Sequence, residues 1–136
     1  MSKLQLKIVT PEKEIYDGEV EMVTVTTPDG EIGILPYHAN LMAQVIPGEL
    51  RIKVGDKVVP MAIGSGLLQM SDNTLILATD MAEKAEDIDE RAVEEAKERA
   101  KAALEQTLTD EEYAVSLATL EKALAQLKVK RRHHHP

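Results

Sequence analysis

Apolar and polar positions alternate in short runs along the first 80 residues of the chain. In residues 3–8, leucine and isoleucine alternate with lysine and glutamine, which is the pattern of a half-buried strand. Residues 20–25 form a second run, in which the adjacent Met22 and Val23 predict a β-bulge within one strand. The pattern therefore begins with two short strands of period two.

Two further pairs of apolar runs are joined by short polar turns. Residues 51–59 carry Gly55 and Asp56 at the centre, where glycine suits a tight hairpin turn. Residues 66–78 have the same form around a polar turn at 71–73. Short strands with regularly spaced turns indicate a β-sandwich or a flattened barrel.

The pattern changes to a helical period after residue 80. The chain has no glycine beyond Gly66, and its last proline is the terminal Pro136. Asp87 or Asp89 can cap the start of a first helix. Alanines then recur at helical spacing and mark a narrow face of small side chains: Ala92, Ala96, Ala100 and Ala103.

A second helix is predicted from residue 109 onward. Thr109 and Glu112 have the spacing of a capping box, in which each side chain bonds the other residue's backbone amide. The apolar stripe that follows is Tyr113, Leu117, Leu120, Leu124 and Leu127. We expect this stripe to pack on the alanine face of the first helix in an antiparallel hairpin.

These patterns divide the chain into two predicted domains. Residues 1–84 form the β-sandwich, called the sandwich domain below, and residues 85–136 form a helical hairpin with a basic tail, called the helical arm. A pair of helices of roughly 20 residues each is marginally stable without docking elsewhere. The helical arm is therefore a candidate for a part that moves.

Composition excludes several kinds of function. The formal net charge is −8, which argues against a nucleic-acid surface, and the absence of cysteine removes disulfides and thiolate sites. We see no P-loop, no G-x-S-x-G sequence and no apolar run near the roughly 20 residues that span a bilayer. Three terminal histidines, 133–135, suggest a flexible tail or a tag remnant rather than a metal site.

Residues 30–41, GEIGILPYHANL, are the most specific segment of the chain. They resemble the G-x-x-G-[IL]-x-P-x-H-A-x-L signature of the epsilon subunit of bacterial-type F1Fo ATP synthases. Residues 45–52 resemble the I-x-P-G-x-[ILM]-R-[IV] strand of that family, and residues 63–68 resemble its glycine-containing S-G-G segment with an altered glycine placement. Residues 83–129 are similar to its two C-terminal helices.

The resemblance implies a ten-stranded β-sandwich followed by a helical hairpin, in a non-catalytic subunit of the rotor that needs no cofactor. It implies that the sandwich domain attaches to the gamma subunit and to the polar loops of the membrane c-ring. Glu31 and His38 match family positions at that attachment. The alternative explanation for Glu31 is a solvated turn residue. For His38 it is a histidine whose hydrogen bonds order its loop.

The resemblance also implies that the helical arm extends into the alpha/beta catalytic hexamer and restrains ATP hydrolysis. Five basic residues at the end of the second helix are candidates for contact with the hexamer: Lys122, Lys128, Lys130, Arg131 and Arg132. Basic residues also suit the C-terminus of a helix electrostatically, which is a second explanation for them.

Many bacterial members of the family bind ATP in the hairpin through an I/L-D-x-x-R-A motif. Ile88 and Asp89 match its beginning and Arg99 matches a later basic position, but Ala92 stands where the motif has arginine. Lys122 likewise replaces an arginine and cannot form the same two-pronged contact with phosphate. We therefore predict that nucleotide binding is weak or absent.

The leading hypothesis is a central-stalk subunit on the cytoplasmic face of the cell membrane, peripheral and without direct membrane insertion. It would couple gamma to the c-ring during proton- or ion-driven ATP synthesis. The alternative is a free-standing β-sandwich protein-binding module with a helical dimerisation arm. A stable homodimer through residues 87–129, formed without gamma, would favour the alternative.

Overall fold

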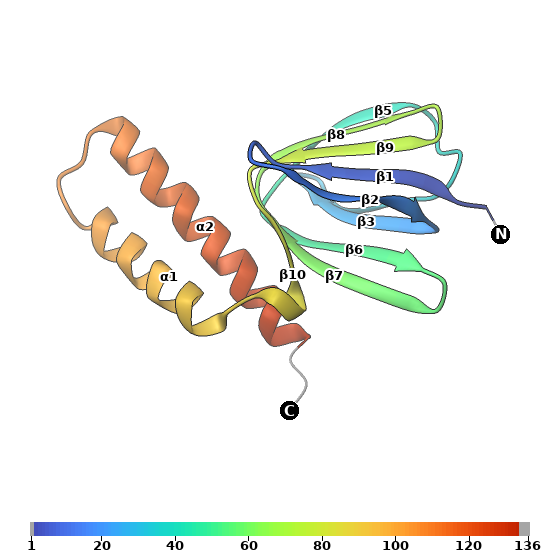
Figure 1. Cartoon of the computed structure of the whole chain (residues 1–136). Helices are drawn as coiled ribbons and strands as arrows, with labels where there is room; N and C mark the ends of the chain where they lie inside the picture. The colour runs from blue at the N-terminus through green and yellow to red at the C-terminus, as the bar shows by residue number, and fades with distance from the viewer. Residues whose placement is uncertain (1, 134–136) are drawn as a thin grey trace.

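The computed structural model describes residues 2–133 and contains ten strands followed by two α-helices (Figure 1). The strands are β1 (Leu4–Val9), β2 (Glu14–Val20), β3 (Met22–Thr27), β4 (Gly30–Ile34), β5 (Leu41–Val45), β6 (Gly48–Val54), β7 (Lys57–Ile63), β8 (Gly66–Ser71), β9 (Thr74–Thr79) and β10 (Ala82–Lys84). A short 3-10 helix, η1 (Ala85–Asp87), leads to α1 (Glu90–Leu104) and α2 (Asp110–Arg132).

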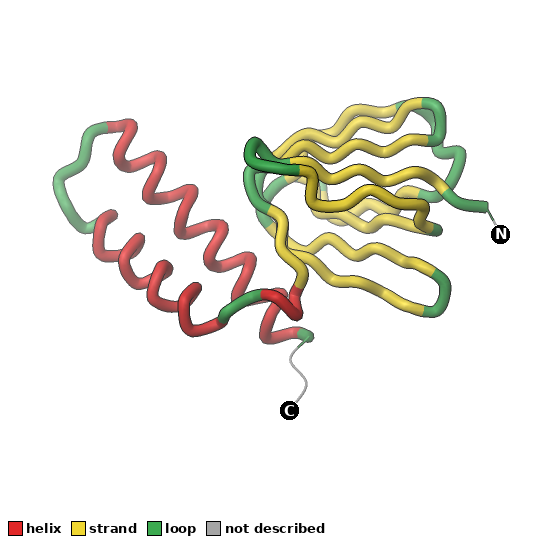
Figure 2. The backbone as a smooth tube through the Cα atoms, in the orientation of Figure 1, coloured by secondary structure: helices red, strands yellow, loops and turns green. Residues whose placement is uncertain are grey.

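The strands form two five-stranded sheets that face each other, with the helices at one end (Figure 2). The first sheet has the order β2-β1-β9-β8-β5, in which β1 and β9 are parallel. The second sheet has the order β10-β7-β6-β3-β4, and all its paired strands are antiparallel. The predicted β-sandwich of about ten strands is confirmed.

Both predicted hairpins are confirmed by the strand pairing. Strands β6 and β7 pair from Gly48↔Ile63 to Val54↔Lys57, and Gly55 takes a φ of 62° at the turn. Strands β8 and β9 are joined by Asp72 and Asn73, whose φ angles are 50° and 57°. Two successive residues in the left-handed backbone conformation give the turn a twist that matches that of the flanking strands.

The single strand predicted over residues 20–25 is wrong. Val20 ends β2 in the first sheet, and Met22 begins β3 in the second, so the chain changes sheets at Glu21. The amide of Glu21 donates to the carbonyl of Lys53, 2.8 Å away, which fixes the crossing to the second sheet. The pairing shift lies at Ile8/Val9 instead of the predicted Met22/Val23 position.

Aliphatic side chains from both sheets form the core of the sandwich domain. Its members lie at alternate positions of the strands, as the period-two pattern predicts. The largest fully buried side chains are Leu4, Leu6, Ile8, Ile34, Leu50, Ile52, Met61, Ile63, Leu68, Met70, Leu75 and Leu77. None of them comes from the helical arm, so the sandwich domain has a core of its own.

The two helices form the predicted antiparallel hairpin (Figure 1); of the two candidates for the first cap Asp89 caps α1, and the predicted Thr109 caps α2. The Asp89 side chain accepts from the amide of Ala92 at 3.1 Å. Thr109 accepts from the amide of Glu112 at 3.1 Å, and the Glu112 carboxylate accepts from the amide of Thr109 at 3.2 Å. The starts of both helices were therefore predictable from the sequence.

The predicted packing of the leucine stripe is wrong for most of its length. Tyr113, Leu117 and Leu124 are 51%, 36% and 49% exposed, and only Leu127 of the stripe is buried. In the first half of α2, Val115, Ser116 and Thr119 line a shallow groove beside Ala96 and Ala100 of α1. The stripe consequently leaves an apolar helix face open.

Candidate functional site

The helical arm is fastened to the sandwich domain by polar side chains on one face of α2. Residues 122, 126 and 130 are four apart, so they lie on the same side of the helix. Each contacts the segment 80–85, which contains β10 and the first residue of η1. The contacts are Lys122 Nζ to Asp80 Oδ2 (3.1 Å), Gln126 Nε2 to Glu83 Oε1 (2.9 Å) and Lys130 Nζ to the Ala85 carbonyl oxygen (3.1 Å).

The apolar part of this junction is small. It is a cluster separate from the core of the sandwich domain and consists of Ala62, Ala85, Ile88, Val93, Ala123, Leu127 and Val129, with Met81 partly buried against it. Of the members in the described structure, only Ala62 belongs to a strand. Apolar burial therefore holds the two helices to the residues just before α1, Met81, Ala85 and Ile88, more than to the sheets.

A buried carboxylate on β6 meets the end of α2. Glu49 is 7% exposed, and its Oε2 lies 3.4 Å from Arg132 Nη1 and 3.2 Å from His133 Nε2. Its Oε1 accepts a hydrogen bond of 3.1 Å from Arg51 Nη1 on the same strand. Three side chains with basic groups thus surround Glu49, two of them from the helical arm.

Arg51 also holds Glu31 on the edge strand β4. Its two terminal nitrogens donate to the two oxygens of Glu31, at 2.6 Å and 3.1 Å. These hydrogen bonds, and the positive charge of Arg51, hold the pKa of Glu31 below its usual range. Glu31, Glu49 and Arg132 line one cleft of about 650 Å³ between the sandwich domain and α2.

The structure places the five basic candidates for hexamer contact along the second half of α2. Four of them have partners within the chain: Lys122 and Arg132 bond Asp80 and Glu49 of the sandwich domain, and Lys130 bonds the Ala85 carbonyl. Arg131 bonds Glu90 and Glu94 of α1, at 3.0 Å and 2.9 Å. Lys128 is exposed and lines the cleft. In the docked helical arm most of these cations are already paired.

His38 and Glu31 lie in different settings. Glu31 is paired with Arg51, whereas His38 is exposed in the β4–β5 loop with its Nδ1 2.7 Å from the carbonyl oxygen of Ala39. The neighbouring Tyr37 has a φ of 64°, and its amide donates to the Asn73 side chain at 2.7 Å. Asn73 therefore anchors the loop that carries His38.

The four candidate nucleotide residues are not gathered in one cavity of the described structure. Ile88 is buried in the apolar cluster, and the Asp89 carboxylate caps α1. Lys122 pairs with Asp80, while Arg99 lines the shallow groove between α1 and α2. Three of the four thus have a structural role in the docked helical arm.

An apolar surface on the sandwich domain escaped the sequence analysis. Met42, Leu67 and Ile76 are 71%, 57% and 40% exposed. Strand pairing places them on the outer face of the first sheet together with Ala78, because Met42, Gln69 and Ile76 stand in one row and Leu67 and Ala78 in the next. We call Met42, Leu67, Ile76 and Ala78 the outer patch.

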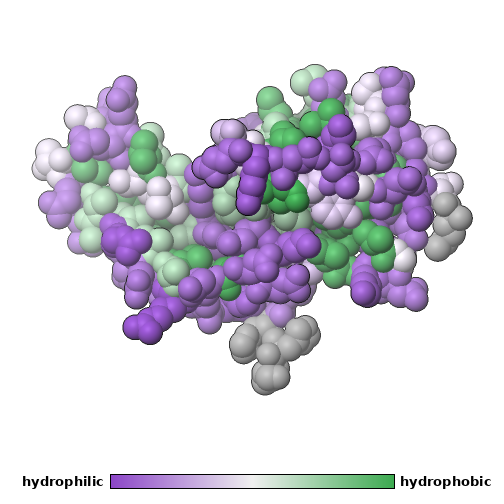
Figure 3. Space-filling model, viewed as in Figure 1, coloured by the Kyte–Doolittle hydropathy of each residue, from purple (hydrophilic) through white to green (hydrophobic). Residues whose placement is uncertain are grey.

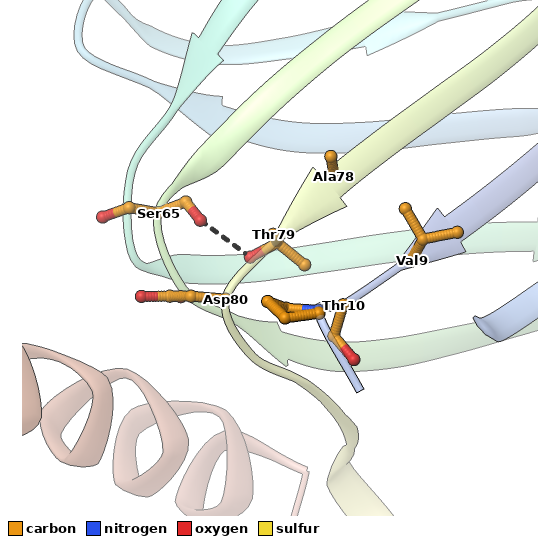
Figure 4. Close-up of a pocket in the computed structure, with 7 residues that line it drawn as sticks. Val9, Thr10, Ser65, Ala78, Thr79 and Asp80 are labelled. Atoms are coloured by element: carbon orange, nitrogen blue, oxygen red, sulfur yellow. Dashed lines mark hydrogen bonds between the residues drawn. The ribbon is translucent and has the colours of Figure 1, made fainter. Parts of the chain in front are cut away.

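The outer patch continues into a shallow apolar pocket where β1 and β9 end (Figure 4). Val9, Ala78 and Thr79 line it, and the Thr79 hydroxyl donates to the Ser65 carbonyl at 3.0 Å. In the space-filling view, apolar surface appears between polar regions on both the sandwich domain and the helical arm (Figure 3). Consecutive apolar residues at 67–68 and 75–77 were the sequence signal, because they place apolar side chains on both faces of a strand.

Comparison with known proteins identifies the family. The family model for the ATP synthase delta/epsilon chain β-sandwich domain matches residues 3–85, and that for the long α-helix domain matches residues 86–131. An ATP synthase epsilon chain from Hydrogenovibrio crunogenus is 38% identical over 125 residues, covering 92% of this chain and 87% of the relative. One from Dehalococcoides mccartyi is 36% identical over 138 residues, covering 100% and 99%. The chain belongs to the ATP synthase epsilon family.

Solved structures share the fold of this epsilon chain. A chain of the Euglena gracilis mitochondrial ATP synthase aligns with a TM-score of 0.75 and 24% identity, over 92% of this chain and 79% of its own length. A chain of the Tetrahymena thermophila enzyme aligns with a TM-score of 0.63 and 18% identity, over 95% and 97%. The chain is a non-catalytic subunit of ATP synthase, as the sequence resemblance predicts.

Two features of the described residues concern membranes and metals. Neither α1 nor α2 offers a stretch that is both long and apolar enough to cross a bilayer. Residues 2–133 hold no group of three or more histidine, cysteine or acidic side chains placed to bind a metal. His134 and His135 of the terminal histidine run lie outside the described residues.

Proposed function

We propose that this epsilon chain works as a rotor subunit with a detachable brake. The sandwich domain couples the gamma subunit to the c-ring during proton- or ion-driven ATP synthesis, and the helical arm restrains ATP hydrolysis. One observation carries the proposal: cations that are candidates for contact with the alpha/beta hexamer are the same cations that fasten the helical arm to the sandwich domain.

This double use makes docking and extension compete. Lys122 and Arg132 bond Asp80 and Glu49 of the sandwich domain in the docked state, whereas Lys130 bonds the Ala85 carbonyl within the helical arm. When the arm leaves the sandwich domain, Lys122 and Arg132 lose these partners and become available to an acidic segment of the hexamer. Exposed ion pairs contribute only about 0–1 kcal/mol each, so neither arrangement is fixed irreversibly.

The outer patch supports attachment to gamma. Contiguous exposed apolar side chains on an otherwise polar protein mark interaction surfaces, and Met42 on the edge strand β5 lies beside β8, which carries Leu67. We assign this face to gamma. We assign Glu31, which lies in the cleft beside α2, and His38, in the β4–β5 loop anchored by Asn73, to the polar loops of the c-ring. The structure that contains the Tetrahymena relative is one of a central stalk with its c-ring.

These assignments place the chain on the cytoplasmic face of the cell membrane, peripheral to it and held there by other subunits. The epsilon family membership supports this location, because the ATP synthase complex is anchored by its membrane sector. The chain itself then needs no membrane insertion.

We further propose that ATP binding to the helical arm is weak or absent. Gln126 donates to Glu83, and Lys122 pairs with Asp80, so neither side chain is free to meet a phosphate while the arm is docked. Ala92 provides no charge where the family motif has arginine. We expect isothermal calorimetry with Mg-ATP to give no binding in the micromolar range, and micromolar binding would contradict this proposal.

Substitution of the outer patch tests the attachment to gamma. The double variant Met42→Glu, Leu67→Glu places two charges in the proposed contact, where burial without partners is costly. We expect at least a tenfold loss of affinity for purified gamma, measured by biolayer interferometry. Val58→Glu is the matched control, because Val58 is 55% exposed on β7 of the other sheet.

Unchanged affinity in the patch variant, or an equal loss in the control, would contradict the assignment. A chain that ignores gamma and forms a stable homodimer in light scattering would instead support the protein-binding module with a dimerisation arm. The exposed stripe of Tyr113, Leu117 and Leu124 would be the natural dimer contact in that case.

A further inference from the structure

We propose that four charged residues form a relay: Glu31, Arg51, Glu49 and Arg132. The relay links the binding of an outside cation by Glu31 to the docking of the helical arm. A cation that captures the Glu31 carboxylate from outside weakens the hold of Glu49 on Arg132 and releases the arm. The identity of that outside cation as a basic c-ring loop rests on the proposed function. The relay itself is a property of this chain alone.

The relay is continuous in space although its members come from distant parts of the sequence. Arg51 donates to both Glu31 oxygens and, through its Nη1, to Glu49 Oε1. The other oxygen of Glu49 faces Arg132 Nη1 at the end of α2. Each guanidinium therefore stands beside a carboxylate, and Arg51 is shared between two.

The charges of the relay balance only when the arm is docked. Two carboxylates then face two guanidinium groups, with His133 beside Glu49 as an additional contact. Undocking removes Arg132 and leaves Arg51 alone between Glu31 and Glu49. Because Glu49 is 7% exposed, it is screened by water less than a surface carboxylate and its pairing counts more.

Capture of Glu31 reverses this balance. Arg51 can then bond Glu49 alone. Arg51 and Arg132 therefore compete for the same Glu49 carboxylate. The local excess of positive charge repels Arg132, the one member that can leave with the arm. By linkage the effect is reciprocal, so a docked arm also lowers the affinity of Glu31 for an outside cation.

A thiol reporter measures arm release in the isolated full-length chain. The chain has no cysteine, and Ala62 is fully buried in the cluster that the arm covers. In an Ala62→Cys background, modification by a thiol reagent requires the arm to open. In a Val25→Cys background, modification requires the sandwich domain itself to unfold, because Val25 is fully buried in its core.

Glu31→Gln mimics capture by removing the charge of the carboxylate. We expect it to speed modification of the Ala62→Cys reporter about twofold to fivefold and to leave the Val25→Cys reporter unchanged. Glu19→Gln is the matched control, because it removes one carboxylate from an exposed position of β2 in the other sheet.

The coupling is tested by a double-mutant cycle. Arg132→Gln should itself speed modification of the Ala62→Cys reporter, and in that background Glu31→Gln should add little, because the released cation is already absent. Arg131→Gln, which loses bonds to Glu90 and Glu94 within the arm, serves as its neighbouring control and should leave the Glu31 effect in place.

Three results would overturn the relay. The first is no acceleration by Glu31→Gln, the second is an equal acceleration by Glu19→Gln, and the third is a full Glu31 effect in the Arg132→Gln background. None of these measurements uses gamma, the c-ring or the hexamer. Failure of the relay is therefore separate from failure of the proposed function.

Discussion

At the scale of single residues, Glu31 shows what the sequence contains and what it omits. The GxxG signature predicts a turn residue at the surface, and the structure has Glu31 on the edge strand β4 with half of its surface covered. Its partner Arg51 is 20 positions away in the sequence. The pair could not be inferred from the sequence, because it depends on β3 pairing with both β4 and β6, which brings β4 and β6 close together.

The same pair makes a prediction about pH. Arg51 lowers the pKa of Glu31 in the folded chain, so the pair stabilises the fold above the unfolded pKa of the carboxyl group. That stabilisation is lost as the pH falls through the lower folded pKa. We expect Arg51→Gln to raise the pKa of Glu31 toward its ordinary value, as measured by NMR titration of the carboxyl carbon.

Lys53→Gln is the control for this titration, because Lys53 is exposed on the same strand as Arg51. It removes an equal charge without a bond to Glu31. The explanation fails if the two substitutions move the pKa of Glu31 equally, or if neither moves it.

At the scale of elements, the sequence was sufficient where the signal is local. The turn at Gly55 and the caps at Asp89 and Thr109 depend on neighbouring residues, and all three are confirmed. The predicted packing of the leucine stripe was wrong because α2 has two neighbours, α1 and the sandwich domain. Helical period reveals an apolar face but does not say which neighbour covers it.

Gly66 shows a long-range constraint on a single element. It lies in β8 opposite Thr79, and an added Cβ would run into the carbonyl oxygen of Ala78. Because backbone atoms cannot turn away, we expect Gly66→Ala to lower the free energy of unfolding by about 1–3 kcal/mol, measured by urea denaturation.

Gly18→Ala is the matched control for that measurement. It also lies in a strand, and its added Cβ would meet Tyr16 Cε1 at an ordinary 3.4 Å. The expected change in its free energy of unfolding stays within about 1 kcal/mol. Equal changes in the free energy of unfolding for the two variants would contradict the predicted crowding at Gly66.

At the scale of the whole molecule, the domains differ in how they are held together. The sandwich domain has its own aliphatic core, whereas the helical arm joins it through polar contacts and the single strand residue Ala62 among those described. Family membership supplies the complex in which this matters. The two sheets and the hairpin were predictable from the sequence, but the pairing of the arm's cations with Asp80 and Glu49 was not, because it depends on how the domains dock.

The most direct test of this account is the rate of ATP hydrolysis by a reconstituted catalytic complex. One preparation carries the full-length chain and the other a chain that ends at Lys84, which keeps every member of the sandwich core. With assembly verified in both, the account predicts that hydrolysis is several-fold faster without the helical arm. Equal rates in the two complexes would contradict the claim that the arm is a brake.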